Sequence, residues 1–168
     1  FGVLRGTNSR GILLELLFVL ETSKDRSIYV DRFLPNTLLR IVVDHLGNDV
    51  TDRYSVETLD KKMIPGQIDA LLDNQTLMET TLPNMIPAAT KMVEEQSTKE
   101  IKNALQRMNL TLNHEIDRLK ILQQKNKNIR PAEIQTALHE QLTLTSLIKD
   151  ARVRLDAIQL ILCTGVVF

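Results

Sequence analysis

The sequence predicts an α+β protein, and three observations support this prediction. Five of the six aromatic residues precede residue 55, as do four of the six glycines, which suits strands and turns. The remainder is rich in Leu, Ala, Gln, Glu and Lys, which favour helices. Residues 156–163 then alternate again and predict a strand that returns to the first ones. We therefore expect a single domain, residues 1–168, with a small, mostly antiparallel sheet and a long antiparallel helical hairpin.

The β-rich first part, residues 1–54, is expected to form an N-terminal meander. Its three predicted strands are residues 12–22, 28–34 and 38–44. The first is apolar apart from Glu15, as in a strand covered on both faces. The second alternates and ends at Pro35, which cannot donate to a ladder. Gly47 suits a turn after the third strand, and the glycines of residues 2–11 predict a loop.

Helical periodicity begins after residue 54 and covers residues 55–154. Ser55 is expected to cap a short helix that runs through Met63. A second helix is expected over residues 67–81. Asn84 is expected to cap a third, with Pro87 close to its first turn, where proline is tolerated.

A helical hairpin is predicted over residues 101–155, because apolar residues recur every three or four positions in both halves. The first stripe is Ile101, Leu105, Met108, Leu112, Ile116, Leu119 and Leu122, and the second is Ile134, Leu138, Leu142, Thr145, Ile148, Ala151 and Leu155. Pairing them from tip to base gives a nearly constant register, as antiparallel helices require. Pro131 and Glu133 suit the first turn of the second helix, and Lys149, Arg152 and Arg154 suit its last.

Composition and charge exclude several classes of protein. The chain is 43% hydrophobic, enough for a sizeable core, and 21 basic residues balance 21 acidic ones. Bulk attraction to nucleic acid or membranes is therefore not expected. A single cysteine, Cys163, favours a reducing compartment, and we expect a buried structural cysteine and a cytoplasmic protein. The longest apolar run, residues 12–20, is too short to cross a bilayer, so no membrane partner is expected.

Motifs for chemistry are mostly missing from the sequence. The glycines of residues 2–11 lack the spacing of a phosphate-binding loop. HEIDR and HEQLT begin like a zinc-protease helix, but Arg118 and Thr143 stand where the second histidine belongs. Glu94 and Glu95 are neighbours on a helix and do not converge on one substrate. We therefore predict no catalytic, cofactor-binding or metal-binding residue, and no enzyme activity for this chain.

One local charge cluster is the candidate site. Residues 117–130 hold five basic residues against one acidic residue, near the predicted tip of the hairpin. The candidate contact patch consists of Lys120, Lys125, Lys127 and Arg130. It is either a solvated helix end or a surface that contacts phosphates or an acidic protein.

Four stretches carry a family resemblance: GILLELLFVLET, RFLPNTLLRIVVDHLGNDV, NKNIRPAEI and RLDAIQLILCTG. In this order they resemble the C-terminal region of the RapA family, bacterial RNA polymerase-associated ATPases of the Swi2/Snf2 helicase-like class. The resemblance implies a fragment of a multidomain parent whose upstream lobes bind ATP and Mg and hydrolyse ATP. It implies RNA polymerase, nucleic acid and upstream domains of the same chain as partners, and a role in polymerase recycling during transcription. None of the family's ATPase motifs matches this chain, so the resemblance implies a non-catalytic accessory module.

Two other classes of function remain open. A free-standing helical-hairpin adaptor or dimerisation module is the main alternative. A small enzyme with a dispersed active site would need a pocket with convergent ionisable residues of shifted pKa.

Overall fold

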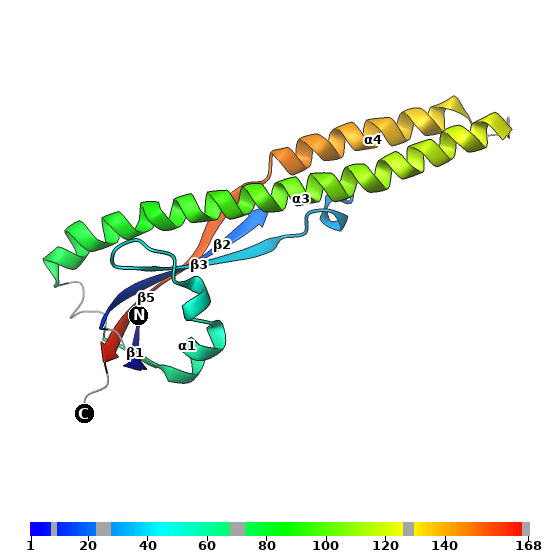
Figure 1. Ribbon diagram of the computed structural model, residues 1–168. Coiled ribbons are helices and arrows are strands. Elements are labelled where there is room, and N and C mark those ends of the chain that lie inside the picture. Colours follow the sequence, from blue (N-terminus) through cyan, green and yellow to red (C-terminus); the bar gives the residue numbers. More distant parts are fainter. Residues whose placement is uncertain (8–9, 23–27, 68–72, 126–129, 166–168) are drawn as a thin grey trace. The chain divides into compact units, whose positions relative to one another are not determined.

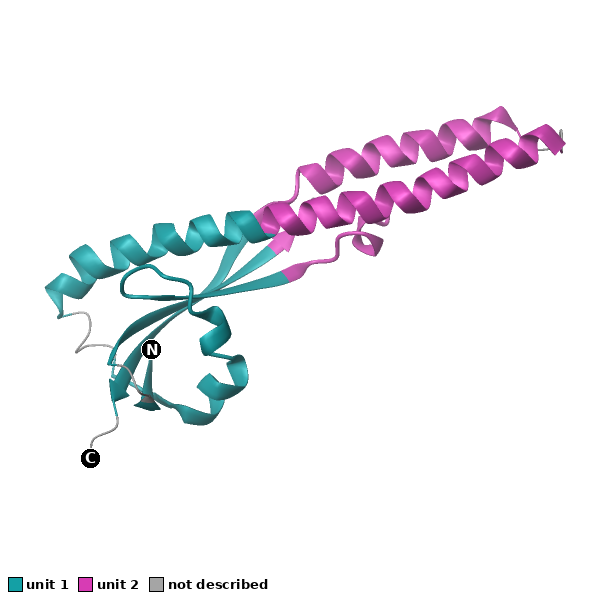
Figure 2. Ribbon diagram, in the orientation of Figure 1, with its two compact units in different colours: residues 1–19, 38–96, 154–168 teal, residues 20–37, 97–153 magenta. Residues whose placement is uncertain are grey.

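The computed structural model describes the chain except residues 8–9, 23–27, 68–72, 126–129 and 166–168 (Figure 1). Two compact units are present, each assembled from separate parts of the sequence (Figure 2). The sheet unit comprises residues 1–19, 38–96 and 154–168, and the hairpin unit comprises residues 20–37 and 97–153.

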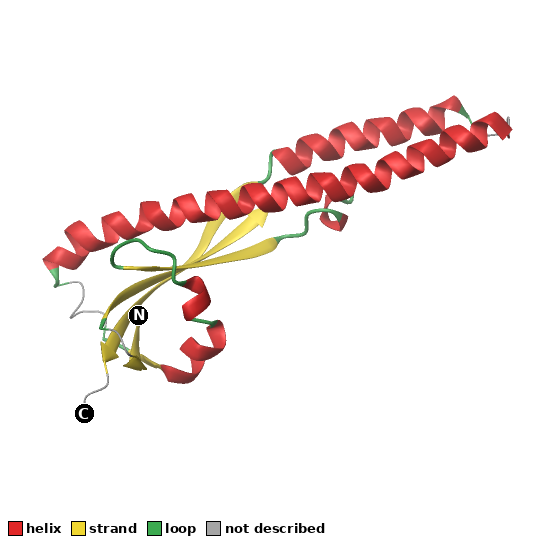
Figure 3. Cartoon of the chain, in the orientation of Figure 1, coloured by secondary structure: helices red, strands yellow, loops and turns green. Residues whose placement is uncertain are grey.

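Strands and helices together confirm the α+β class (Figure 3). The strands are β1 (Gly2–Thr7), β2 (Gly11–Glu21), β3 (Thr37–Asp44), β4 (Met63–Pro65) and β5 (Arg152–Gly165). The helices are α1 (Val56–Lys62), α3 (Leu82–Lys125) and α4 (Pro131–Lys149), with the 3₁₀ turns η1 (Val30–Arg32) and η2 (Thr51–Arg53) and the π-helical segment η3 (Leu77–Thr81). The long helix α3 contributes residues 82–96 to the sheet unit and the rest to the hairpin unit.

The five strands form one mixed sheet in the order β3-β2-β5-β1-β4. The returning C-terminal strand is confirmed, and it is longer than the predicted residues 156–163. It lies between β2 and β1 and runs parallel to β1, with Gly2 opposite Ile161 and Leu4 opposite Cys163. β4 pairs with the other edge of β1 in antiparallel orientation. The three-stranded meander predicted over residues 12–22, 28–34 and 38–44 is wrong, because residues 28–34 form no strand, although β2 and β3 are neighbours in the sheet.

The N-terminal residues form a strand, not the predicted loop. Glycine content indicated a loop, but Gly2 serves a close approach: a Cβ there would collide with the Sδ of Met63 on β4. Both strands that pair with β1 come from much later in the sequence. Local patterns could not reveal pairing of this kind.

Residues 28–34 form no strand, which corrects the second predicted strand. They contain the 3₁₀ turn η1, and their buried side chains are Val30, Phe33 and Leu34. Spacings of three and four residues bury one side of a helical turn, whereas a strand would bury every second residue. The apolar spacing fits the turn better than the strand.

Both faces of the sheet are buried around β2, as its apolar sequence predicted. On one face Leu13 packs with Leu4, Val42 and Ile161, and Leu59 of α1 covers this cluster. Leu14, Leu16 and Ile41 alternate with these residues and are also buried. From the first part of α3, the apolar side chains of Met85, Ala89 and Val93 are buried at helical spacing.

Glu15 is a buried charged side chain in the middle of this mostly apolar strand. Its Oε1 accepts from Arg40 Nε at 2.5 Å, and Arg40 also donates from Nη2 to the Tyr54 carbonyl at 2.6 Å. The two charged side chains are only 11% and 15% exposed. Burial of charge is expensive unless it is paired, so Arg40 permits Glu15 to lie in the sheet.

Two of the predicted local signals are confirmed in the sheet unit. Ser55 is the N-cap of α1, and its Oγ accepts from the Thr58 backbone N–H at 3.2 Å. Gly47 has a φ of +81°, which lets the chain turn after β3.

The start of the long helix differs from prediction. Asn84 caps nothing, because helical structure is already present at residue 75, and the Asn74 side chain accepts from the Leu77 N–H at 3.1 Å. Pro87 lies inside α3, beyond its first turn. Of the helix predicted over residues 67–81, residues 68–72 lie outside the described residues, residues 67, 73 and 74 are not helical, and residues 75–81 are helical and continue into α3.

The antiparallel hairpin is confirmed, with a shorter second arm and a different register. α4 ends at Lys149, and β5 begins at Arg152, so Leu155 belongs to the sheet. Leu142, predicted in the seam, is 70% exposed, whereas Leu144 is fully buried. The Gln141 amide donates instead to Asn109 and Asn113 of α3, at 3.1 and 2.9 Å.

The hairpin register is displaced by about one helical turn from prediction. The predicted pairing of Leu142 with Ile116 would place Gln141 beyond Asn113, towards the tip. In Figure 1, α3 correspondingly extends past the first turn of α4 at the tip. A stripe with one apolar residue per turn looks the same after a shift of one turn, so spacing alone could not fix the register.

Candidate functional site

The tip of the hairpin carries the predicted contact patch. Lys120 and Lys125 lie on the last two turns of α3, and Arg130 is the N-cap of α4. All three residues are exposed. Lys127, the fourth predicted residue, lies outside the described residues. The structure thus places three of the four predicted residues at one end of the hairpin.

Acidic neighbours reduce part of this positive charge. Lys120 Nζ lies 3.7 Å from the Asp117 carboxylate. Arg118 donates twice to Glu115, each time at 3.1 Å, and these hydrogen bonds and the charge of Glu115 raise the pKa of Arg118. Because both pairs are solvent-exposed, they hold their partners weakly.

Lys125 and Arg130 are the strongest candidates for contact. Within the described part of the chain, neither side chain has a carboxylate partner. The Arg130 backbone N–H is 3.5 Å from Glu133 Oε1, so the start of α4 is capped while Arg130 itself is exposed. Such cations can engage phosphates or carboxylates with little desolvation and little rearrangement.

Contacts with η1 brace the hairpin, and no pattern in the sequence had indicated them. Arg32 donates to Glu140 of α4 at 2.5 Å, and its guanidinium lies 4.6 Å from the centre of the Phe33 ring. Arg107 of α3 donates to the Phe33 carbonyl at 3.0 Å. One short turn therefore contacts both helices of the hairpin, which helps to keep their relative position fixed.

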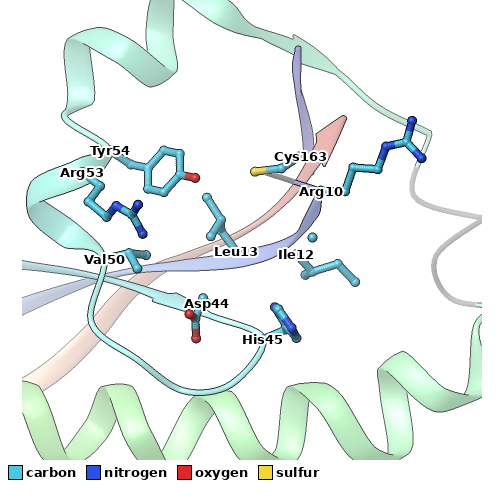
Figure 4. A pocket seen from close by; sticks show the side chains of 10 residues that line it. Arg10, Ile12, Leu13, Asp44, His45, Val50, Arg53, Tyr54 and Cys163 are labelled. Atoms are coloured by element: carbon cyan, nitrogen blue, oxygen red, sulfur yellow. The ribbon is translucent and has the colours of Figure 1, made fainter. Parts of the chain in front are cut away.

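A pocket of about 100 Å³ opens in the sheet unit at the ends of β2, β3 and β5 (Figure 4). Tyr54 and Cys163 point toward each other above Leu13, whereas the Arg10 side chain points away from them. Cys163 is buried, as predicted for a structural cysteine. The sequence had not indicated that these residues meet.

The carboxylate of Asp44, at the rim of this pocket, accepts hydrogen bonds from residues of its own turn. Its carboxylate accepts from the N–H groups of Leu46 and Asn48, both at 2.9 Å, and from the Asn48 side chain at 3.0 Å. Partial burial acts to raise the pKa of Asp44, but these hydrogen bonds and the nearby His45 outweigh it and lower the pKa. A carboxyl group with a lowered pKa is a poor proton donor or acceptor at neutral pH, so Asp44 fits a structural role.

Two further features bear on the kind of site. Among the residues that the structure describes, no three His, Cys, Asp or Glu side chains are grouped to hold a metal ion. In the same part of the chain, no helix has the length and apolarity needed to cross a membrane.

Comparison with known families gives one match that covers nearly the whole chain. The RapA_C model, described as RNA polymerase recycling family C-terminal, matches residues 3–163. The match includes both the sheet unit and the hairpin unit.

Three curated proteins that are similar to this chain carry the description RNA polymerase-associated protein RapA. The protein of Histophilus somni is 36% identical over 151 residues, and that of Vibrio parahaemolyticus is 32% identical over 150 residues. The protein of Vibrio campbellii is 31% identical over 150 residues. Each alignment covers 89% of this chain but only 16% of the relative. The chain thus spans about a sixth of the length of these relatives.

Proposed function

Because the chain belongs to the RapA C-terminal family of RNA polymerase-associated proteins, we propose that it is a non-catalytic interaction module. Its parent is an ATP-dependent helicase-like protein that aids RNA polymerase recycling during transcription. The module contributes contact, and the parent's upstream lobes contribute hydrolysis with ATP and Mg²⁺. The proposed location is the cytoplasm, where bacterial transcription takes place.

The family match over residues 3–163 carries this proposal. The distribution of charged groups gives a second support. The tip presents exposed cations, whereas Asp44 at the rim of the pocket accepts hydrogen bonds from Asn48 in its own turn.

Within the module, we propose the tip as the contact surface toward polymerase or nucleic acid. The helices bring Lys120, Lys125 and Arg130 to one exposed end, and the sequence places Lys127 between the last two. Local charge of this kind acts even though the whole chain is neutral, because screening limits each charge to about 10 Å. A stiff helical arm also loses little conformational freedom when it binds.

Charge reversal in the parent protein tests this surface. The variant carries Lys120→Glu, Lys125→Glu, Lys127→Glu and Arg130→Glu, and association with polymerase and with nucleic acid is measured over a salt series. We expect weaker association at low salt and a smaller difference as salt rises. If the partner is nucleic acid, the slope of log K against log salt should fall by about 0.9 for each phosphate that the variant no longer neutralises.

A control reverses three exposed lysines elsewhere on α3, against four cations in the tip variant. Lys91→Glu, Lys99→Glu and Lys102→Glu change the net charge in the same direction on the same helix, away from the tip. The control should bind nearly as the unmodified parent does. Equal losses in both variants would indicate bulk charge, and no loss in the tip variant, with the fold intact, would contradict the proposed surface.

A further inference from the structure

The middle strand of the sheet has one open edge. β5 pairs with β1 only from Ile161 onward, where Gly2 is its first partner. On that side, no other strand in the described part of the chain pairs with the residues before Ile161, although β2 lies on their opposite side. We call residues 155–160 the open edge.

Exposure of the side chains agrees independently with this pairing. Ile161 is fully buried, whereas Leu155 is 47% exposed and Ile158 is 53% exposed. A strand with neighbours on both sides and a covered face would bury such residues. Edge strands with exposed apolar side chains are natural templates for pairing with another strand.

We propose that an extended segment of the parent chain adds a strand to the open edge, parallel to β5 and in line with β1. The inference rests on the proposed function, in which this module belongs to a longer parent. The ladder from Gly2–Ile161 to Leu4–Cys163 is in constant register, so Phe1 is level with Leu160. In the parent, the residues that directly precede Phe1 can therefore continue in the direction of β1 and lie beside the open edge without a turn.

The side chains at the open edge indicate which residues the added strand should carry. Leu155 and Ala157 share a face with Ile161 because alternate residues of a strand point the same way. Leu17 and Val19 of the neighbouring strand β2 are also apolar and only partly buried. The added strand should therefore place apolar residues at every second position, facing Leu155 and Ala157. Since parent segments are tethered to the module, their effective concentration is in the millimolar range without a separate binding partner.

Hydrogen exchange of the full parent, followed by mass spectrometry, tests the added strand. In a true edge, about half of the amides of residues 155–160 would lack a partner and exchange fast. With the strand added, these amides should exchange about as slowly as those of residues 161–165, which already lie between two strands. Exchange about tenfold faster than in residues 161–165 would overturn the proposal. Protection that rises with protein concentration would assign the edge to a second copy and would overturn it too.

Paired cysteines in the parent test the register directly. Leu155→Cys is combined with a cysteine at the fifth residue before Phe1, which the register places opposite it. The control moves the second cysteine by one residue, so that its side chain points to the other face. Disulfide formation should be about tenfold faster in the first pair than in the control. Equal rates would contradict the proposed strand.

Hydrogen exchange and polymerase association, measured on the same parent protein, distinguish failure of the added strand from failure of the proposed function. A parent that associates with polymerase while its residues 155–160 exchange fast would contradict only the added strand. A protected edge in a parent that does not associate with polymerase would contradict only the proposed function.

Discussion

The sheet unit and the hairpin unit each contain an arginine–glutamate pair with the same 2.5 Å separation, in opposite surroundings. Arg40 and Glu15 in the sheet have side chains that are 15% and 11% exposed. Arg32 and Glu140 on the hairpin have side chains that are 44% and 39% exposed. Distance alone would make the two pairs equivalent.

Burial makes their energetic roles different. Solvent screens the exposed pair, and pairs of this kind contribute about 0–1 kcal/mol. In the buried pair, removal of one partner leaves a charge without compensation, which typically costs about 3–5 kcal/mol. The sheet unit therefore depends on its ion pair, whereas the hairpin unit depends on its apolar seam and on the Gln141 hydrogen bonds.

The largest effect should come from removal of β5, which would break the sheet unit itself. A chain that ends at Arg154 lacks Ile161 and Cys163, which complete the core around Leu4 and Leu13. We expect loss of cooperative unfolding, measured by circular dichroism on heating. A melting curve like that of the full chain would contradict the central position of the strand.

Single substitutions in the two ion pairs test the comparison directly. Glu15→Ala should lower the free energy of unfolding by about 3 kcal/mol, because Arg40 remains buried without its carboxylate. Glu140→Ala should lower it by less than about 1 kcal/mol. Urea denaturation measures both values. Similar losses would show that burial does not distinguish the pairs.

Removal of the polar interaction in the hairpin seam should have an intermediate effect. Gln141→Ala removes two hydrogen bonds, to Asn109 and Asn113, and should cost about 1–2 kcal/mol in urea denaturation. Gln135→Ala, at an exposed position of the same helix, is the matched control and should be nearly neutral. If the two variants unfold alike, the seam hydrogen bonds do not stabilise the hairpin.

The smallest effect concerns pH and the turn after β3. Because the pKa of Asp44 is lowered in the folded state, its ionised form stabilises the fold above its ordinary pKa of about 3.9. This stabilisation is lost as the pH falls through the lower folded value. Asp44→Asn should therefore be less stable than the unmodified chain at pH 7, by about 1 kcal/mol or less, and the difference should shrink as the pH falls below the ordinary pKa of Asp44. A difference that is constant with pH would contradict this role.

Local patterns predicted much of the fold because several elements depend on their own residues. The mostly apolar run of β2, the alternation of β3 and β5, the Ser55 cap and the Gly47 turn are confirmed. β1 and β4 were not predicted, because β1 pairs with strands that are distant in the sequence. The hairpin was predicted, but its register was not, since apolar stripes repeat every turn and Gln141 was not recognised as a seam residue.

The candidate site could be predicted only in part. Counting charges located the cations of the tip, because both helices had been inferred from periodicity. The contacts of Arg32 and Arg107 with the hairpin could not be found in this way, since residues 28–34 were assigned to a strand. The open edge could be recognised only from the register between β1 and β5, which local sequence patterns do not predict.

Pairing between Gly2 and Ile161 has a consequence for the order of events during synthesis. Ribosomes add about 5–20 residues per second, so β1, which can pair early with β4 on one edge, waits about 8–30 s for β5 on its other edge. Until then, β1 and β2 lack the strand that lies between them, while the local contacts of the hairpin can already form. A nascent chain of this topology completes its sheet last and exposes unpaired strands in the meantime, so we expect it to need chaperones most just before β5 leaves the ribosome.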